Sequence, residues 1–110
     1  MELTVSEQQP FTIVRVDGNL DTGTAEEFQK LCLQLVAEGK NRLVLDLEQL
    51  SYLSSAGLRG IIIVGKKAKA AKGKLLVCHL SGVAQDVFLM SGFDALFPVY
   101  KDLDELLTKE

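Results

Sequence analysis

The stretch that decides the fold is Leu47-Glu48-Gln49-Leu50-Ser51-Tyr52-Leu53-Ser54-Ser55-Ala56-Gly57-Leu58-Arg59. An apolar run, 43–45, precedes it, and apolar residues at helical spacing follow it. Ser54 and Ser55 therefore fall where a loop becomes a helix. Either hydroxyl could cap the first turn, because the first backbone N–H groups of a helix have no partner inside it. The positive end of the helix dipole would also suit a phosphate group at this place.

Length and composition predict one domain spanning residues 1–110. The chain has 110 residues, of which 47% are hydrophobic and 25% are charged, as in soluble globular proteins. The net charge of −3 argues against direct binding of nucleic acid, which requires a positive surface. Cys32 and Cys78 lie in apolar segments without a CxxC motif, so we expect two buried free thiols in a reducing compartment.

We expect the protein to be cytoplasmic, without membrane insertion. The first residues, 1–4, lack the basic and apolar segments of a signal peptide. The longest apolar run, 61–64, is far too short to span a membrane.

Alternating strand and helix patterns predict an α/β domain. Its sheet should be mixed but mostly parallel, packed with about four helices in the order β-β-α-β-α-β-α-β-α. We expect a capping box formed by Thr24 and Glu27, a helix end at Gly39, and a last helix capped by Asp102. The expected elements are strands near 3–7, 11–17, 43–45, 74–78 and 97–100, and helices near 24–38, 55–71, 82–91 and 102–107.

The helix predicted over 55–71 has two different faces. The residues expected to face the sheet are Leu58, Ile61, Ile62, Gly65 and Ala68. The outer face carries four basic side chains and one exposed isoleucine, which are Arg59, Lys66, Lys67, Lys69 and Ile63. The basic residues are most simply explained as a solvated face.

The chain offers little for catalysis. Its one histidine, His79, follows an apolar strand, and no Ser-His-Asp set can be assembled around it. The glycines near 57–60 do not match a phosphate-binding loop. Asp21 and Asp46 lie where strands should end, where turn and capping roles are common. We therefore do not expect an enzyme, although a small-ligand or catalytic site using Asp21, Asp46 and Ser55 is one alternative.

Three segments resemble a known family. Residues 45–58, with Ser54, Ser55 and Gly57, resemble the signature of STAS domains of the bacterial anti-sigma factor antagonist type. Residues 18–25 are similar to the family's second-strand exit and first helix start, and residues 83–93 to its third helix and following turn. The similar segments extend over nearly the whole chain in the same order.

The resemblance implies a phosphorylation switch that regulates transcription by partner switching. In this family, the unmodified domain binds a serine kinase that is also an anti-sigma factor and resembles histidine-kinase ATPases, so the sigma factor is released. The kinase then phosphorylates a serine at the start of the second helix, and a metal-dependent serine phosphatase reverses this. On this sequence the phosphorylated residue is Ser55, and Asp21 matches an acidic position used in partner recognition. ATP and magnesium belong to the kinase, so the resemblance implies no cofactor here.

Position 54 departs from the commonest family pattern. Aspartate usually precedes the target serine, whereas here Ser54 supplies a second candidate hydroxyl. An unphosphorylated STAS adaptor subunit of a membrane transport or signalling complex is therefore the main alternative. The predicted contact surface consists of Asp21, Ser54, Ser55, Gly57, Arg59 and Ile63, with Asp46 near enough to repel a phosphate.

Overall fold

The computed structural model describes residues 1–110 as one α/β domain with six strands and four helices. The elements are β1 (Glu2–Gln8), β2 (Phe11–Leu20), α1 (Ala25–Ala37), β3 (Arg42–Asp46), β4 (Leu50–Leu53), α2 (Ser55–Ala70), β5 (Lys74–Cys78), α3 (Gly82–Met90), a short 3-10 turn (Phe93–Ala95), β6 (Val99–Tyr100) and α4 (Leu103–Lys109). The predicted fold class is therefore confirmed. The observed order, β-β-α-β-β-α-β-α-β-α, contains one strand more than expected.

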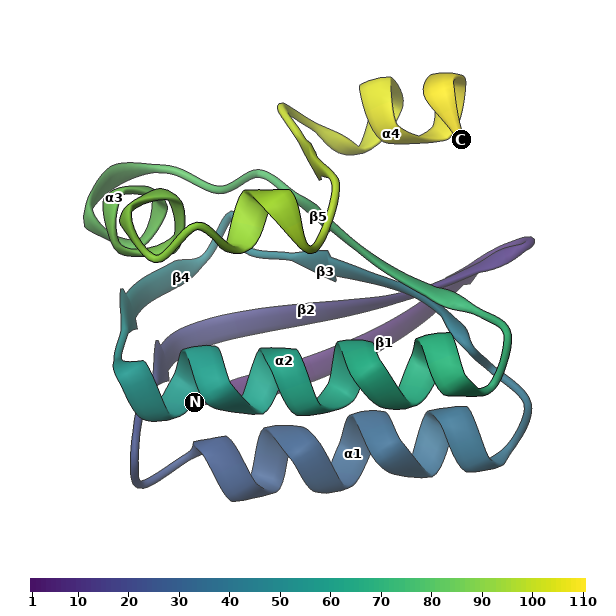
Figure 1. Ribbon diagram of the computed structural model, residues 1–110, viewed down its shortest axis with the longest axis horizontal. Helices are drawn as coiled ribbons and strands as arrows, with labels where there is room; N and C mark the ends of the chain where they lie inside the picture. Colours follow the sequence, from purple (N-terminus) through teal and green to yellow (C-terminus); the bar gives the residue numbers. More distant parts are fainter.

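The sheet is mixed and mostly parallel, with the strand order β1-β2-β3-β5-β6. β1 and β2 form an antiparallel hairpin, and the other neighbours along the sheet are parallel. α1 and α2 lie together on one side of the sheet, and α4 lies on the other (Figure 1). The carboxyl ends of β2, β3 and β5 meet at one edge, where loops in α/β proteins commonly carry binding residues.

Two hydrophobic clusters hold these layers together. The larger has 21 buried residues and joins α1, α2 and α3 to the sheet, whereas the smaller has six and lies between the sheet and α4. Leu43, Val44 and Leu45 are completely buried because β3 is covered on both faces. Cys32 and Cys78 are both buried and unpaired, as predicted.

β4 is the strand that the sequence did not reveal. It has four residues and is separated from β3 by a turn, so its pattern resembles a loop. β4 pairs in parallel with the last residues of β2, Gly18 to Leu20, beyond the part of β2 that pairs with β3. This pairing carries the chain directly to the first residue of α2.

One local prediction was wrong. The Thr24 side chain does not cap α1 through a box with Glu27. Its hydroxyl instead donates to the carbonyl of Asn19 (2.7 Å) and accepts from the N–H of Asp21 (3.0 Å). The loop before α1 thus folds back on itself and uses the Thr24 oxygen for its own turn.

The predicted inner face of α2 is confirmed at Leu58, Ile61, Gly65 and Ala68, which are all buried. Val64 is fully buried there, although it was not expected to be, and Ile62 is half-buried. At Gly65 an added Cβ would lie 2.3 Å from the ring of Phe97. A side chain at position 65 is therefore excluded by the segment that runs from α3 to β6.

Candidate functional site

The two serines at the start of α2 have different surroundings. Ser54 is the N-cap, and its Oγ accepts a hydrogen bond from the N–H of Gly57 at 3.2 Å. Ser55 is the first helical residue and is exposed, and its hydroxyl makes no hydrogen bond within the chain. The capping role therefore falls to Ser54, which leaves the Ser55 hydroxyl available to solvent and to other proteins.

The Asp21 loop lies against this turn. The N–H of Ser54 donates to the carbonyl of Leu20 (3.0 Å), and an added Cβ at Gly57 would lie 2.4 Å from the same oxygen. Glycine at position 57 thus permits the close approach of α2 to the end of β2. Asp21 directly follows Leu20 and is half-buried, and one of its carboxylate oxygens accepts from the N–H of Gly23 at 3.0 Å.

Arg59 and Ile63 continue the same side of α2. They follow Ser55 at intervals of four residues, so the three side chains share one helical face. Arg59 is exposed, and Ile63 retains 39% exposure despite its apolar side chain. Ile63 borders a shallow depression of about 420 Å³ between α1 and α2, together with Leu33 and Lys66. The structure therefore brings the predicted surface residues together along the start and outer face of α2.

Asp46, unlike Asp21, does not lie on this surface. It is 3% exposed, and both of its carboxylate oxygens have partners within the chain. One oxygen lies 3.3 Å from the Arg15 guanidinium, and the other lies 3.0 Å from Nδ1 of His79 and accepts from the N–H of Glu48. Asp46 therefore does not contribute an exposed charge beside the serines, contrary to expectation, and it does not share a surface with Asp21 and Ser55.

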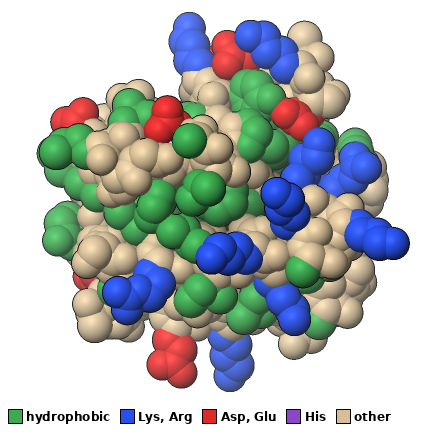
Figure 2. Space-filling model, viewed as in Figure 1, with side chains coloured by type: hydrophobic (Ala, Val, Ile, Leu, Met, Phe, Trp, Pro, Cys, Tyr) green, Lys and Arg blue, Asp and Glu red, His purple; other side chains and the backbone are tan.

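Sequence reasoning missed an apolar surface on α3. Hydrophobic side chains gather over α3 and between α3 and α2 in Figure 2, with Lys and Arg side chains beside them. Val83 and Met90 are 67% and 87% exposed, and Leu96 just after α3 is 58% exposed. The sequence signal for this surface is that α3 has more apolar residues than its buried face can hold. Only Ala84 and Phe88 are buried in this nine-residue helix.

No helix in the structure is both long enough and apolar enough to cross a bilayer.

Comparison with known proteins agrees with the arrangement of strands and helices. The STAS domain family matches residues 2–106. The chain belongs to this family. Within it, the chain is similar to BtrV of Bordetella bronchiseptica, a protein named as an anti-sigma factor antagonist, with 36% identity over 90% of this chain and 85% of BtrV.

Two further relatives are mycobacterial. The STAS chain is 26% identical to the anti-sigma-F factor antagonist RsfB of Mycobacterium tuberculosis, over 96% of this chain and 86% of RsfB. The crystal structure of an anti-sigma factor antagonist from Mycobacterium paratuberculosis superimposes with a TM-score of 0.88 and 27% identity, over 97% of this chain and 91% of that one. The family resemblance seen in the sequence is thus confirmed, and antagonists of this family are regulators without enzymatic activity.

Proposed function

We propose that this STAS domain is a cytoplasmic anti-sigma factor antagonist that binds an anti-sigma factor kinase until Ser55 is phosphorylated. The names of its relatives support the antagonist role. The observation that carries the switch is the contrast between the two serines. Ser54 is occupied as the cap of α2, whereas Ser55 is exposed with a free hydroxyl.

The partner would bind the surface formed by Asp21, Ser54, Ser55, Gly57, Arg59 and Ile63. Ile63 supplies an exposed apolar anchor. Arg59, one helical turn away from Ile63, can donate hydrogen bonds to carboxylates of the partner. The Asp21 loop is held against the same turn by the Leu20 carbonyl. An interface centred on Ser55 would therefore contain both apolar and charged groups on a rigid support.

Phosphorylation would then act mainly through charge. A phosphoserine adds about −1.5 to −2 charges and three strong acceptor oxygens. The free domain can tolerate this group at the N-terminus of α2, where backbone N–H groups and the helix dipole favour an anion. In an interface the same group must lose its water, and about 2.7 kcal/mol is enough to weaken binding a hundredfold. Half-buried Asp21 would add like-charge repulsion.

The test uses the cognate kinase with ATP and magnesium, followed by intact mass measurement. We expect one phosphate on the wild-type chain and none on Ser55→Ala. The matched variant is Ser54→Asn, which keeps a capping side chain but removes the second hydroxyl, and it should still accept one phosphate.

Two results would contradict this proposal. Loss of the phosphate in Ser54→Asn but not in Ser55→Ala would show that Ser54, not Ser55, is the modified serine. If neither serine is modified while wild-type protein co-purifies with membrane proteins, the domain is a constitutive adaptor instead. A serine phosphatase of the metal-dependent class should remove the phosphate from the expected product.

A further inference from the structure

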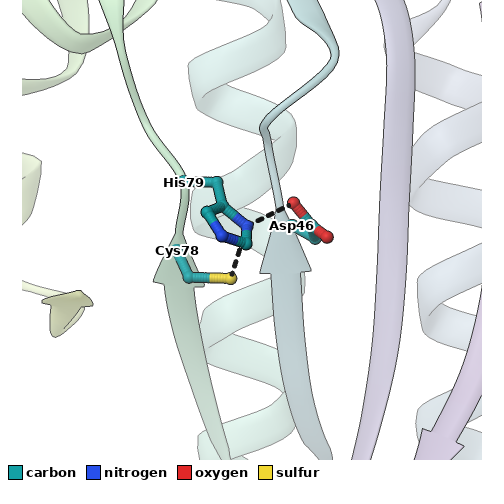
Figure 3. Close-up of side chains that lie close together, drawn as sticks. All are labelled: Asp46, Cys78 and His79. Atoms are coloured by element: carbon teal, nitrogen blue, oxygen red, sulfur yellow. Dashed lines mark hydrogen bonds and ion pairs between the residues drawn. The ribbon is translucent and has the colours of Figure 1, made fainter. Parts of the chain in front are cut away.

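Three side chains with metal-binding atoms meet at the carboxyl ends of β3 and β5. Asp46 ends β3, Cys78 ends β5 beside it in register, and His79 follows Cys78. Figure 3 shows the three side chains converging from these two neighbouring strands. Their ligand atoms all lie within 4.8 Å of one another. The cluster lies on the α4 side of the sheet, because Cys78 belongs to the small hydrophobic cluster there.

The spacing of these atoms suits a small transition-metal cation. His79 Nδ1 lies 3.0 Å from Asp46 Oδ1 and 3.8 Å from Cys78 Sγ. Zinc bonds of about 2.0 Å to nitrogen or oxygen and 2.3 Å to sulfur place neighbouring tetrahedral ligands roughly 3.2 to 3.8 Å apart. A cation could therefore bind all three atoms with small movements of the side chains. A thiolate, an imidazole and a carboxylate are also the ligand types that zinc accepts.

The groups around the cluster favour a positive ion. Glu48 Oε2 lies 3.9 Å from His79 Nε2, so a carboxylate faces the ring nitrogen that points away from the other ligands. Asp46, Asp102 and Glu48 place negative charges around Cys78, against one opposing guanidinium, that of Arg15. The local potential is thus negative, and Arg15 contacts the oxygen of Asp46 that faces away from His79.

A route for the ion exists on the histidine side. The His79 side chain is 23% exposed, whereas the Asp46 side chain is 4% exposed and Cys78 is buried. His79 also adopts a positive φ of 60°, which is uncommon for a residue with a side chain and turns the chain sharply after Cys78. This turn places the ring between the two strand ends and at the surface.

We propose that Asp46, Cys78 and His79 bind a divalent zinc-class cation, with water as the fourth ligand. The sulfur–metal bond forms as the Cys78 thiol releases its proton to solvent, and no atom changes oxidation state. The ion would tie the end of β3 to the end of β5. This site is separate from the serine surface and does not depend on the proposed antagonist function.

The experiment is a titration of the chelator-treated and reduced 110-residue chain with Co²⁺, followed by absorption spectroscopy. We expect a thiolate-to-cobalt charge-transfer band in the wild-type chain, displaced by added Zn²⁺. Cys78→Ser should abolish the band. Cys32→Ser is the matched control, because Cys32 is also a buried thiol but lies in α1, outside the ligand cluster. This control should keep the band unchanged.

Two variants cover the case in which Cys78→Ser does not fold. Asparagine tolerates positive φ, so His79→Asn should keep the turn but weaken Co²⁺ binding more than about a hundredfold. Glu48→Gln should weaken binding by about 10- to 100-fold through the histidine. The proposal is overturned if the wild-type chain gives no charge-transfer band, if Cys32→Ser loses it, or if the folded His79→Asn variant binds Co²⁺ as tightly as wild type.

Discussion

The backbone N–H of Ser54 donates a 3.0 Å hydrogen bond to the carbonyl oxygen of Leu20. This bond joins the residue that caps α2 to the last residue of β2, immediately before Asp21. The serine turn and the acidic loop therefore form one unit, although more than thirty positions separate them in sequence. The two parts of this unit can pack this closely because Gly57 has no side chain.

Gly57→Ala should lower the free energy of unfolding by about 1–3 kcal/mol, because the new Cβ would meet the Leu20 carbonyl at 2.4 Å. Urea denaturation measures this loss. Gly60→Ala is the matched change on the same helix, where the neighbour is the flexible end of Gln29 at 3.2 Å. Its stability should be unchanged or higher by up to about 1 kcal/mol. Equal losses in both variants would contradict the role assigned to position 57.

The two serines should differ in stability as well as in modification. Ser54→Ala removes the oxygen that accepts from Gly57, so it should cost about 1 kcal/mol. Ser55→Ala removes an exposed hydroxyl without a partner in the chain and should change stability by less than about 0.5 kcal/mol. Thermal unfolding of the unmodified proteins measures both effects. A larger loss in Ser55→Ala would mean that Ser55, not Ser54, supports the helix start.

Ile63→Ala should weaken binding to the anti-sigma factor at least tenfold without changing the fold, because it removes an apolar side chain from the proposed interface. Val5→Ala is a close control. Val5 lies on β1 and is 38% exposed, almost the same as Ile63 at 39%. Isothermal titration should show wild-type affinity for the Val5 variant. Equal weakening in both variants would show that α2 has no special part in binding.

The Cys32 thiol should resist alkylation in the folded protein. Burial raises its pKa from 9.0 to about 12, so at pH 8 only about one molecule in ten thousand carries a thiolate. Because the folded pKa exceeds the unfolded one, the neutral thiol stabilises the fold fully below pH 9, and this contribution is lost as the pH rises toward 12. Iodoacetamide labelling followed by mass spectrometry should be slow at pH 8 and fast in urea. Fast labelling of the folded chain would contradict this.

Glu110 should link the stability of the α4 region to acid pH. Hydrogen bonds from Tyr100 and then from Lys74 lower the pKa of its carboxyl below 4.5. The contribution is present above the unfolded pKa and is lost as the pH falls through the lowered folded value. Tyr100→Phe should cost at most about 1 kcal/mol at pH 7, because the pair is exposed, and the difference from wild type should shrink below pH 4.5.

Tyr52→Phe provides the control for this pH series. Tyr52 is 48% exposed and its hydroxyl makes no hydrogen bond within the chain. Its removal should leave the dependence of stability on pH unchanged. Denaturant titrations from pH 3 to pH 8 would compare the two variants. This pH range includes the ordinary carboxyl pKa of about 4.3.

The sequence was sufficient for features that depend on local pattern. Helical spacing and the glycine at position 39, which adopts a φ of 89°, predicted the course of α1, and Asp102 caps α4 as expected. The role of Asp46 could not be predicted in this way. Its partners are Arg15 on β2 and His79 just after β5, so their meeting depends on strand register and on the positive φ of His79. β4 was missed for a similar reason, because its pairing with β2 is distant in sequence.

Gly65 has a wider consequence for how this protein can vary. The Phe97 ring occupies the space of the missing side chain, and Leu96 next to it remains exposed beside Ile62 and Lys66. A single methyl group at position 65 would push this aromatic ring outward and alter the shape of the shallow pocket that these residues line beside α2. Relatives that differ at this one position would therefore present a differently shaped surface to their partners, even if every exposed residue were the same.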